Sequence, residues 1–123
     1  MRFMYMVKAD QSYAAGEPPT PALDAAIGKH IDDMTKAGVL VSVGGLAPPS
    51  QGTKIKARSG SLTVTDGPFT EAKEIIGGFA IMQVQSREHA IALGKEFLQL
   101  HVDVLGTSYA GEIEIRQVFG PED

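Results

Sequence analysis

The segment from Asp66 to Glu74 holds the densest group of side chains suited to chemistry. Asp66 precedes Gly67, Pro68 and Phe69, and the Asp-Gly-Pro triplet predicts a rigid turn in which Gly67 takes a positive φ angle. A carboxylate held in one direction by such a turn can act as a general acid or base on a bound molecule. The alternative is a structural turn in which Asp66 accepts hydrogen bonds from neighbouring backbone amides. Spacing alone leaves both interpretations open.

Two histidines are candidates for the partner of this carboxylate. His30 lies within an apolar helical stripe, and its unperturbed pKa near 6.5 makes it a usable acid or base if a pocket is present. The alternative is a structural role, in which His30 is a buried neutral imidazole hydrogen-bonded to a carbonyl group. His101 faces inward if the second helix continues that far, and lies in a loop if it does not. We take Asp66 and His30 as the catalytic candidates. The candidates for binding a ligand are Lys73, Glu71, His101 and Arg116.

The remaining charged groups point to weaker alternatives. Lys54, Lys56 and Arg58 alternate along one predicted strand, either as an anion-binding strip or as charges that protect a sheet edge. A metal needs about three converging ligands, and His101 and Asp103 with the first histidine are the sole candidate set. No cysteine or His-x-x-x-His motif supports that set, so we expect no metal and no cofactor.

The elements that must position these groups follow from periodicity and from turn residues. Alternation over residues 2–8 predicts a strand. Thr20 is the expected N-cap of a helix that ends at Gly38, and Ser86 caps a second one, with residues 100–111 unassigned. Further strands are expected at residues 39–43, 53–58, 61–65, 75–84 and 112–118, with a bulge or close backbone approach near the glycines at 77 and 78.

This order predicts an α+β fold. It reads β-α-β, an inserted hairpin, then β-α-β, which is the split βαβ pattern of ferredoxin-like folds. Two helices would cover one sheet face. We expect the other face to carry Arg2, Met4, Met6, Ala80 and Met82, or their alternates. Because so many methionines are poorly left in water, a second subunit packed sheet to sheet is the simplest cover.

Length and composition limit the function classes. The chain has 123 residues and 43% hydrophobic residues, which fits a single domain spanning 1–123 with a core of its own. The net charge of −4 does not favour nucleic-acid binding. The apolar start is too short for a signal peptide, and no segment approaches the roughly 20 apolar residues of a membrane span. We therefore expect a cytoplasmic protein without a membrane partner.

The segment Asp66–Glu74 followed by Ile76-Gly77-Gly78-Phe79 resembles the signature of the DGPF proteins within the YCII-related superfamily. The resemblance continues through residues 36–40 and 112–119 and covers essentially the whole chain. It implies a ferredoxin-like homodimer whose sheets face each other in a dimeric α/β barrel, and it implies no known reaction. Short YCII relatives carry a His–Asp pair suspected of being an active site, and the matching candidates are His30 and Asp66.

Two functions therefore stand as hypotheses. The first is an acid–base enzyme or small-molecule-binding protein with a pocket at the Asp-Gly-Pro-Phe loop, using Asp66 with His30 or His101. The second is a non-enzymatic regulatory or interaction module, because the resembling proteins occur beside or fused to extracytoplasmic-function sigma factors. Facing titratable groups in a polar pocket would favour the first, and a solid barrel would favour the second.

Overall fold

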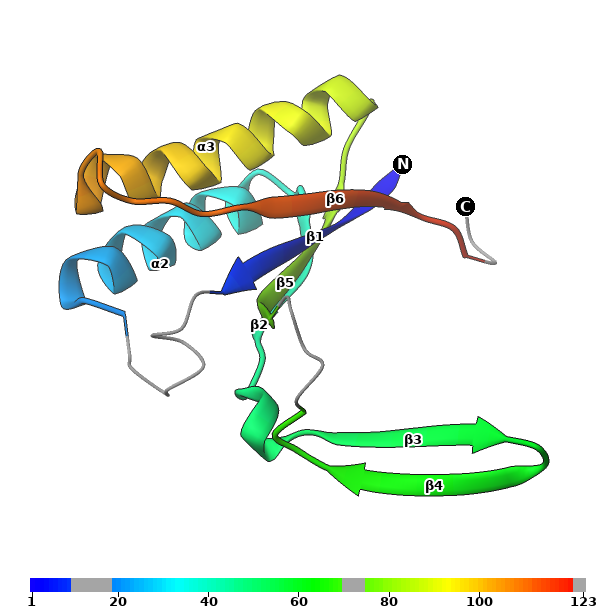
Figure 1. Cartoon of the computed structure of the whole chain (residues 1–123). Coiled ribbons are helices and arrows are strands. Elements are labelled where there is room, and N and C mark those ends of the chain that lie inside the picture. The colour runs from blue at the N-terminus through cyan, green and yellow to red at the C-terminus, as the bar shows by residue number, and fades with distance from the viewer. Residues whose placement is uncertain (10–18, 70–74, 121–123) are drawn as a thin grey trace.

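A computed structural model of the chain describes residues 1–9, 19–69 and 75–120 (Figure 1). The elements follow the predicted order. They are β1 (Arg2–Ala9), α2 (Pro21–Lys36), β2 (Leu40–Gly45), the 3-10 turn η1 (Pro49–Gln51), β3 (Thr53–Arg58), β4 (Ser61–Asp66), β5 (Ile75–Gln83), α3 (Arg87–Leu105) and β6 (Ile113–Val118).

Both helices begin, and α2 ends, at the residues that their capping chemistry predicts. The Thr20 hydroxyl accepts the backbone N–H of Leu23 at 3.2 Å, and Ser86 caps α3 in the same way through His89 at 3.0 Å. At the other end of α2, Gly38 takes φ 76°, and its N–H donates to the Thr35 carbonyl at 3.1 Å. The next N–H, that of Val39, donates to the Met34 carbonyl, which completes a Schellman motif.

The main sheet has the order β2-β5-β1-β6, with every neighbouring pair antiparallel. Leaving out the inserted hairpin, this is the strand order of a ferredoxin-like α+β fold, as predicted. The pairing of β1 with β5 shifts between Val7 and Lys8, where Gly77 is the extra residue, so the expected bulge is present. Both helices lie on one side of this sheet (Figure 1).

The core lies between the helices and the sheet. Its sheet residues include Phe3 and Met82, each 5% exposed, and Met34 and Ala90 reach it from the helices. Met82 therefore lies on the helix-covered face, as does Ala80, which packs against the same cluster. This corrects the assignment of both residues to the open face. Their alternates, Phe79 and Ile81, pair with Met6 and Met4 there.

One small residue lets α3 approach the sheet closely. A Cβ at Gly94 would lie 3.0 Å from the Cδ1 atoms of both Ile113 and Ile115. Beside this contact, the Tyr5 hydroxyl donates to the Ala90 carbonyl at 2.7 Å. Burial raises the pKa of Tyr5 to about 12. The phenol therefore stays protonated and serves the packing of α3 on β1.

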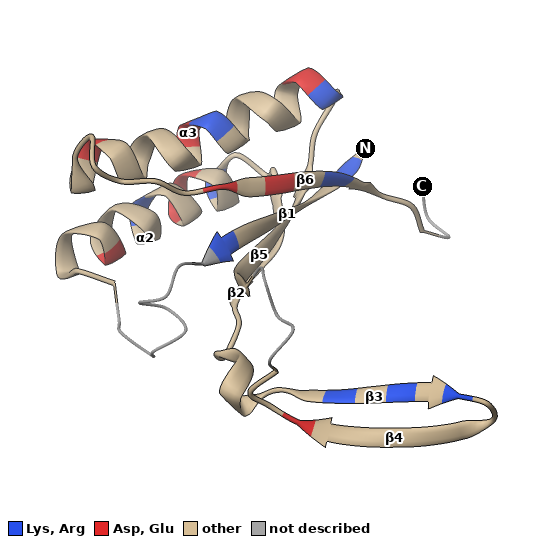
Figure 2. Ribbon diagram, in the orientation of Figure 1, with Lys and Arg blue, Asp and Glu red and all other residues tan. Residues whose placement is uncertain are grey.

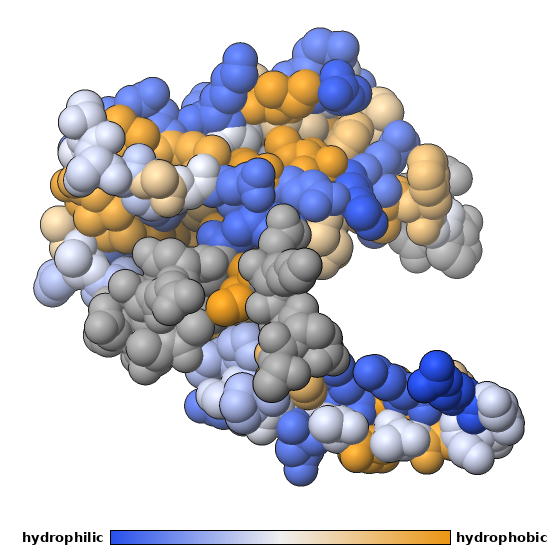
Figure 3. Space-filling model, in the orientation of Figure 1, coloured by the Kyte–Doolittle hydropathy of each residue, from blue (hydrophilic) through white to orange (hydrophobic). Residues whose placement is uncertain are grey.

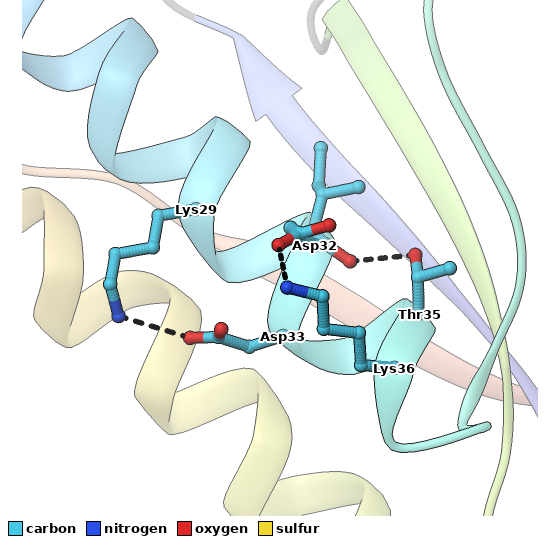
Figure 4. Close-up of polar contacts among 6 residues, drawn as sticks. Lys29, Asp32, Asp33, Thr35 and Lys36 are labelled. Atoms are coloured by element: carbon cyan, nitrogen blue, oxygen red, sulfur yellow. Dashed lines mark hydrogen bonds and ion pairs between the residues drawn. The ribbon is translucent and has the colours of Figure 1, made fainter.

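The outer face of α2 is solvated, as its charge pattern predicts. Lys29 pairs with Asp33 at 3.2 Å and Lys36 with Asp32 at 2.8 Å, and Thr35 donates to the carbonyl of Ile31 (Figure 4). In the part of the chain that the structure describes, neither helix is long and apolar enough to cross a membrane.

Strands β3 and β4 form a separate two-stranded sheet, which we call the arm (residues 53–66). The arm extends away from the rest of the chain, which we call the body (Figure 1). Its strands are joined by Ser59 and Gly60, which take φ angles of 50° and 82°. Two consecutive positive φ angles are typical of a type I′ hairpin turn. The predicted hairpin is therefore confirmed, with its turn at the expected residues.

Gly67 joins the arm to the body, but not through the conformation expected from the sequence. Its φ lies outside the left-handed region, so the predicted positive φ is wrong. Glycine is required there for space, because a Cβ would collide with the Pro49 carbonyl oxygen and lie 3.3 Å from the Phe69 ring. The N–H of Gly67 also donates to the Gly52 carbonyl at 2.9 Å. The segment that enters the arm, at Pro49 and Gly52, and the segment that leaves it, at Gly67, are therefore in direct contact.

Candidate functional site

A cavity of about 700 Å³ lies between α2, α3 and the covered face of the main sheet. Apolar side chains form most of its wall, among them Leu23, Ile27, Phe97 and Leu105. Cavities of this size, mainly apolar with a few polar groups, are typical of sites for small molecules. We therefore take this cavity as the candidate functional site.

His30 supplies the first polar group. Because α2 begins at the Thr20 cap, its inward stripe carries Leu23, then His30, then Met34. The His30 Nε2 atom is buried and has no hydrogen-bond partner among the described residues. Leaving a buried nitrogen unpaired costs about 1–3 kcal/mol. A cavity ligand with a hydroxyl, amide or carbonyl group would remove that penalty.

His101 supplies the second polar group, and it lies on α3 because the helix continues to Leu105. The residue is 7% exposed. Its Nδ1 donates to the Phe97 carbonyl at 2.8 Å, since a carbonyl oxygen can only accept. In the tautomer that carries its hydrogen on Nδ1, the Nε2 atom is left as an acceptor. His101 therefore has the hydrogen bond that is expected of a buried structural histidine. Among the described residues, the Nε2 atom of His30 has no such bond.

Four aromatic rings form a row: Phe97 lies between the two histidines, and Tyr109, in the loop after α3, extends the row beyond His101. The rings of His30 and Phe97 lie 6.3 Å apart, and those of Phe97 and His101 lie 4.6 Å apart. Tyr109 stacks on His101 at 5.2 Å with an interplanar angle of 28°. All four residues line the cavity. They form a continuous aromatic wall that suits a flat apolar ligand.

Glycines shape the opposite wall, where β2 and β5 meet. Gly44, Gly45, Gly77 and Gly78 all line the cavity. A Cβ at Gly78 would lie 3.1 Å from the Gly44 carbonyl oxygen and 3.8 Å from the Gly45 Cα atom. These positions bring two backbones close together and leave main-chain surface facing the cavity.

Among the described residues that line the cavity, Lys8 is the one with a full charge at neutral pH. Its Nζ lies 3.5 Å from a carboxylate oxygen of Glu114, and its side chain is 15% exposed. The hydrogen bond and charge of Arg116, followed by those of Lys8, lower the pKa of the Glu114 carboxyl. Because Glu114 pairs with Met6, it lies on the face of the sheet that the helices leave open, and the Lys8 ammonium points to that face. Lys8 therefore borders the cavity without placing its charge inside it.

The predicted carboxylate lies elsewhere. Asp66 ends β4, is exposed, and accepts a hydrogen bond from the Thr53 hydroxyl at 3.0 Å. It is not among the residues that line the cavity. Phe69 also lies at the base of the arm, where the Lys54 Nζ lies 4.2 Å from its ring centroid. The described residues thus bring His30 and His101 to one cavity and hold Asp66 at the arm.

The other predicted ligand contacts divide in the same way. Arg116 pairs with Glu114 at 2.7 Å, in a register that places it opposite Met4 on the open face of the sheet. Glu71 and Lys73 lie outside the described residues. Among residues 1–9, 19–69 and 75–120, no group of three or more His, Asp or Glu side chains is arranged to hold a metal ion.

Tyr109 and Lys8 line the cavity but are not predicted to do so from the sequence. Tyr109 follows the end of α3 and belongs to no periodic pattern, so no signal marks its ring as inward. Lys8 alternates with the covered residues of β1, and alternation assigns it to the far face. The bulge at Gly77 changes the pairing at this point. The Lys8 ammonium does lie on that far face, beside Glu114, and the predicted bulge is the signal that could have indicated contact of the residue with the cavity as well.

Comparison with protein families identifies a relationship. A family model described as "YCII-related domain" matches residues 1–97. No curated protein matches the chain. The matched range contains His30, Asp66 and Phe97, and it ends before His101 and Tyr109. The outer half of the aromatic wall therefore lies beyond the region that the match covers.

Proposed function

This chain belongs to the YCII-related domain family, and from that premise we propose that it binds a small, mainly apolar molecule in the cavity and exchanges a proton with it through His30. One observation carries the proposal. The His30 Nε2 atom is buried in the wall of a large apolar cavity without a hydrogen-bond partner among the described residues. A functional imidazole needs a free nitrogen directed at its ligand, whereas a structural one has its nitrogens bonded.

The ligand class follows from the wall. A flat ring system would lie along Phe97 and the histidine rings, and one hydroxyl or carbonyl group would reach the His30 Nε2. His101 has a different role. Its bond to the Phe97 carbonyl holds the ring in one orientation, so it positions the ligand and accepts from it at Nε2.

The pairing of Asp66 with His30 stays a prediction. What supports a separate role for Asp66 is its bond to Thr53 at the base of the arm. Replacing Asp66 with Asn keeps the size of the side chain and removes its charge. If Asp66 belongs to the cavity chemistry, this variant will lose proton exchange with a ligand while keeping its stability.

A photoacid provides a direct test of the proposed function. Excited 2-naphthol transfers its hydroxyl proton to a nearby base, and its emission then moves to longer wavelength. We expect bound 2-naphthol to show naphtholate emission in the parent and neutral emission in His30→Leu. The lost hydrogen bond should also weaken binding by about 5–10-fold. Because the chain has no tryptophan, its own fluorescence will not mask the probe.

Two controls complete this test. Naphthalene has the same rings without the hydroxyl, so its affinity should be equal in the parent and in His30→Leu. His89, which is not among the cavity-lining residues, gives the matched variant His89→Leu, and this variant should behave as the parent does. Equal naphthol affinity and equal emission in the parent and in His30→Leu would refute the proposal.

We also propose that the chain forms a homodimer through the open face of its main sheet. Met4, Met6, Phe79 and Ile81 share this face, with the Lys8–Glu114–Arg116 charges beside them. Obligate interfaces between identical subunits typically bury more than about 1,200 Å² in total. Sedimentation equilibrium at micromolar concentration tests this, and a stable monomer would contradict it.

One observation favours the second candidate function, an interaction module. The arm carries apolar side chains that the body does not cover, since Leu62 is 75% exposed and Ile55 69% exposed. Such a surface serves contact with another macromolecule rather than chemistry on a small one. The two functions use different parts of the chain and are compatible.

A further inference from the structure

The arm has two chemically different faces. The cross-strand register pairs Ile55 with Val64 and Ala57 with Leu62, so these four side chains share one face. The other face carries the pairs Lys54 with Thr65, Lys56 with Thr63, and Arg58 with Ser61. The arm is therefore an amphipathic ribbon with one apolar face and one cationic face.

The apolar face is exposed in the single chain. Ile55, Leu62 and Val64 are 69%, 75% and 65% exposed. An isolated two-stranded hairpin is only marginally stable in water, and such ribbons usually gain their stability from a third strand or from packing on another element. Figure 3 shows hydrophobic atoms on the surface of the arm and open space between most of the arm and the body.

Charge identifies the partner that fits this ribbon. The arm holds three of the 11 Lys and Arg residues of the chain and one of the 15 Asp and Glu residues. Its formal charge is therefore +2, and the rest of the chain carries −6, which together give the net −4. Figure 2 shows the basic residues along β3 and most acidic residues on the body. The net charge of the body of a second copy therefore attracts the arm as a whole, while the apolar face supplies the surface to be buried.

We propose that the arm of each chain packs its apolar face against the body of a second copy, so that two arms are exchanged in a symmetric dimer. In a two-fold assembly the same contact forms twice, once for each arm. This inference rests on the proposed homodimer and names a further surface that holds it together. It also gives the base of the arm a function, because the close packing of Gly67 on Pro49 fixes the direction in which the arm leaves the body.

Cross-linking from two neighbouring residues tests the proposal. The chain has no cysteine, so one engineered cysteine is the only attachment point. Leu62→Cys lies on the apolar face, and Thr63→Cys is the matched control on the opposite face of the same strand. Each variant is labelled with a benzophenone maleimide, mixed with an equal amount of ¹⁵N-labelled parent chain, and irradiated.

We expect Leu62→Cys to give a covalent dimer whose cross-linked peptides join the arm of one isotope to the body of the other. Thr63→Cys should give at least about five-fold less of it. Equal yields from the two variants, or cross-links within one chain only, would overturn the proposal. Because a benzophenone is larger than the leucine it replaces, Leu62→Lys and Thr63→Lys are compared by sedimentation equilibrium as a second measurement.

The sedimentation results separate this inference from the homodimer. We expect Leu62→Lys to raise the dimer dissociation constant at least about ten-fold, and Thr63→Lys to leave it within two-fold, with unchanged circular dichroism in both. If the parent is a dimer that neither variant weakens, the role of the arm is refuted and the homodimer stands. If the parent is a monomer, both are refuted.

Discussion

The body and the arm are built from the same kind of strand, but only the body buries its apolar residues. In the main sheet Phe3 and Met82 are each 5% exposed, whereas Leu62 and Val64 in the arm are 75% and 65% exposed. Both regions alternate apolar and polar residues with a period of two. Alternation therefore predicts which side chains share a face, and it does not predict whether another element covers that face.

In the body, the apolar face of the main sheet is covered by two helices that the sequence predicts. Met34 and Ala90 reach the sheet from α2 and α3, and Gly94 lets α3 lie close to it. Among the described residues, the arm has only η1 and Phe69 at its base. The described residues therefore stabilise the distal part of the arm only through its turn and its strand pairing, and the dimer proposed above would add the missing cover. Four experiments test this contrast, in order of decreasing expected effect.

Truncation of a large apolar side chain separates the two regions most strongly. Phe3→Ala should lower the free energy of unfolding by about 3–5 kcal/mol, because it leaves a cavity in the core. Leu62→Ala should change it by less than about 0.5 kcal/mol at low protein concentration, since the side chain is already exposed. Urea denaturation measures both. An equally large effect of Leu62→Ala in a dilute monomer would show that the arm is covered by its own chain.

The base of the arm comes next. Gly67→Ala places a Cβ against the Pro49 carbonyl oxygen, and such overpacking should destabilise the protein by about 1–3 kcal/mol. Gly45→Ala is the matched control, because a Cβ there would lie 3.9 Å from the nearest atom, at ordinary contact distance. Thermal melts of the two variants should differ. Identical melting temperatures would mean that the base of the arm accommodates the added Cβ without loss of stability.

The pH dependence of stability should report on Tyr5 in the body. Burial raises its pKa from 10.0 to about 12, so between these values the folded state keeps a proton that the unfolded state loses. The contribution of Tyr5 to the free energy of unfolding is fully present below pH 10. It falls as the pH rises above 10, by up to about 1.4 kcal/mol per pH unit. Urea melts from pH 9 to 12 should show a shallower fall in Tyr5→Phe. Parallel curves would contradict the buried phenol.

The smallest expected effect is an increase in stability from a substitution in α2. Gly28 lies in the middle of α2, is exposed, and has no atom within 4 Å of the position that a Cβ would take. Gly28→Ala should therefore stabilise the body by about 0.5–1 kcal/mol through helix propensity. The same change at Gly60 should destabilise, because its φ is 82° in the turn of the arm. Thermal melts of both variants check this, and effects of the same sign at the two positions would contradict it.

Local chemistry makes much of the fold predictable. Thr20, Ser86 and Gly38 act at short range, through hydrogen bonds and backbone angles within a few residues, and all three predictions are confirmed. The same holds for the Ser59–Gly60 turn. Periodicity does not assign residues 100–105, although α3 continues through them to Gly106, which takes φ 92°. No capping residue before that glycine marks an earlier end.

The errors concern relations between distant segments. The sequence places Met82 on the wrong face because the parity of β5 relative to β1 depends on register, and a shift of one residue exchanges the two faces. Turn chemistry predicts a positive φ at Gly67, but what this residue needs is room beside Pro49, which is remote from it in sequence. For the site, helical spacing selects His30, whereas nothing in the sequence shows that its Nε2 lacks a partner among the described residues or that Tyr109 stacks on His101.

The contact of Gly94 with the sheet also makes α3 a lever. With a rise of 1.5 Å per residue, Leu105 lies about 16 Å along the helix from Gly94. A tilt of about 4° around that contact would therefore move the far end by about 1 Å. Phe97, His101 and Leu105 all lie on the longer side of this fulcrum and line the cavity. A single methyl group at the fulcrum would thus change the width of the cavity at a distance, and the far end would move most.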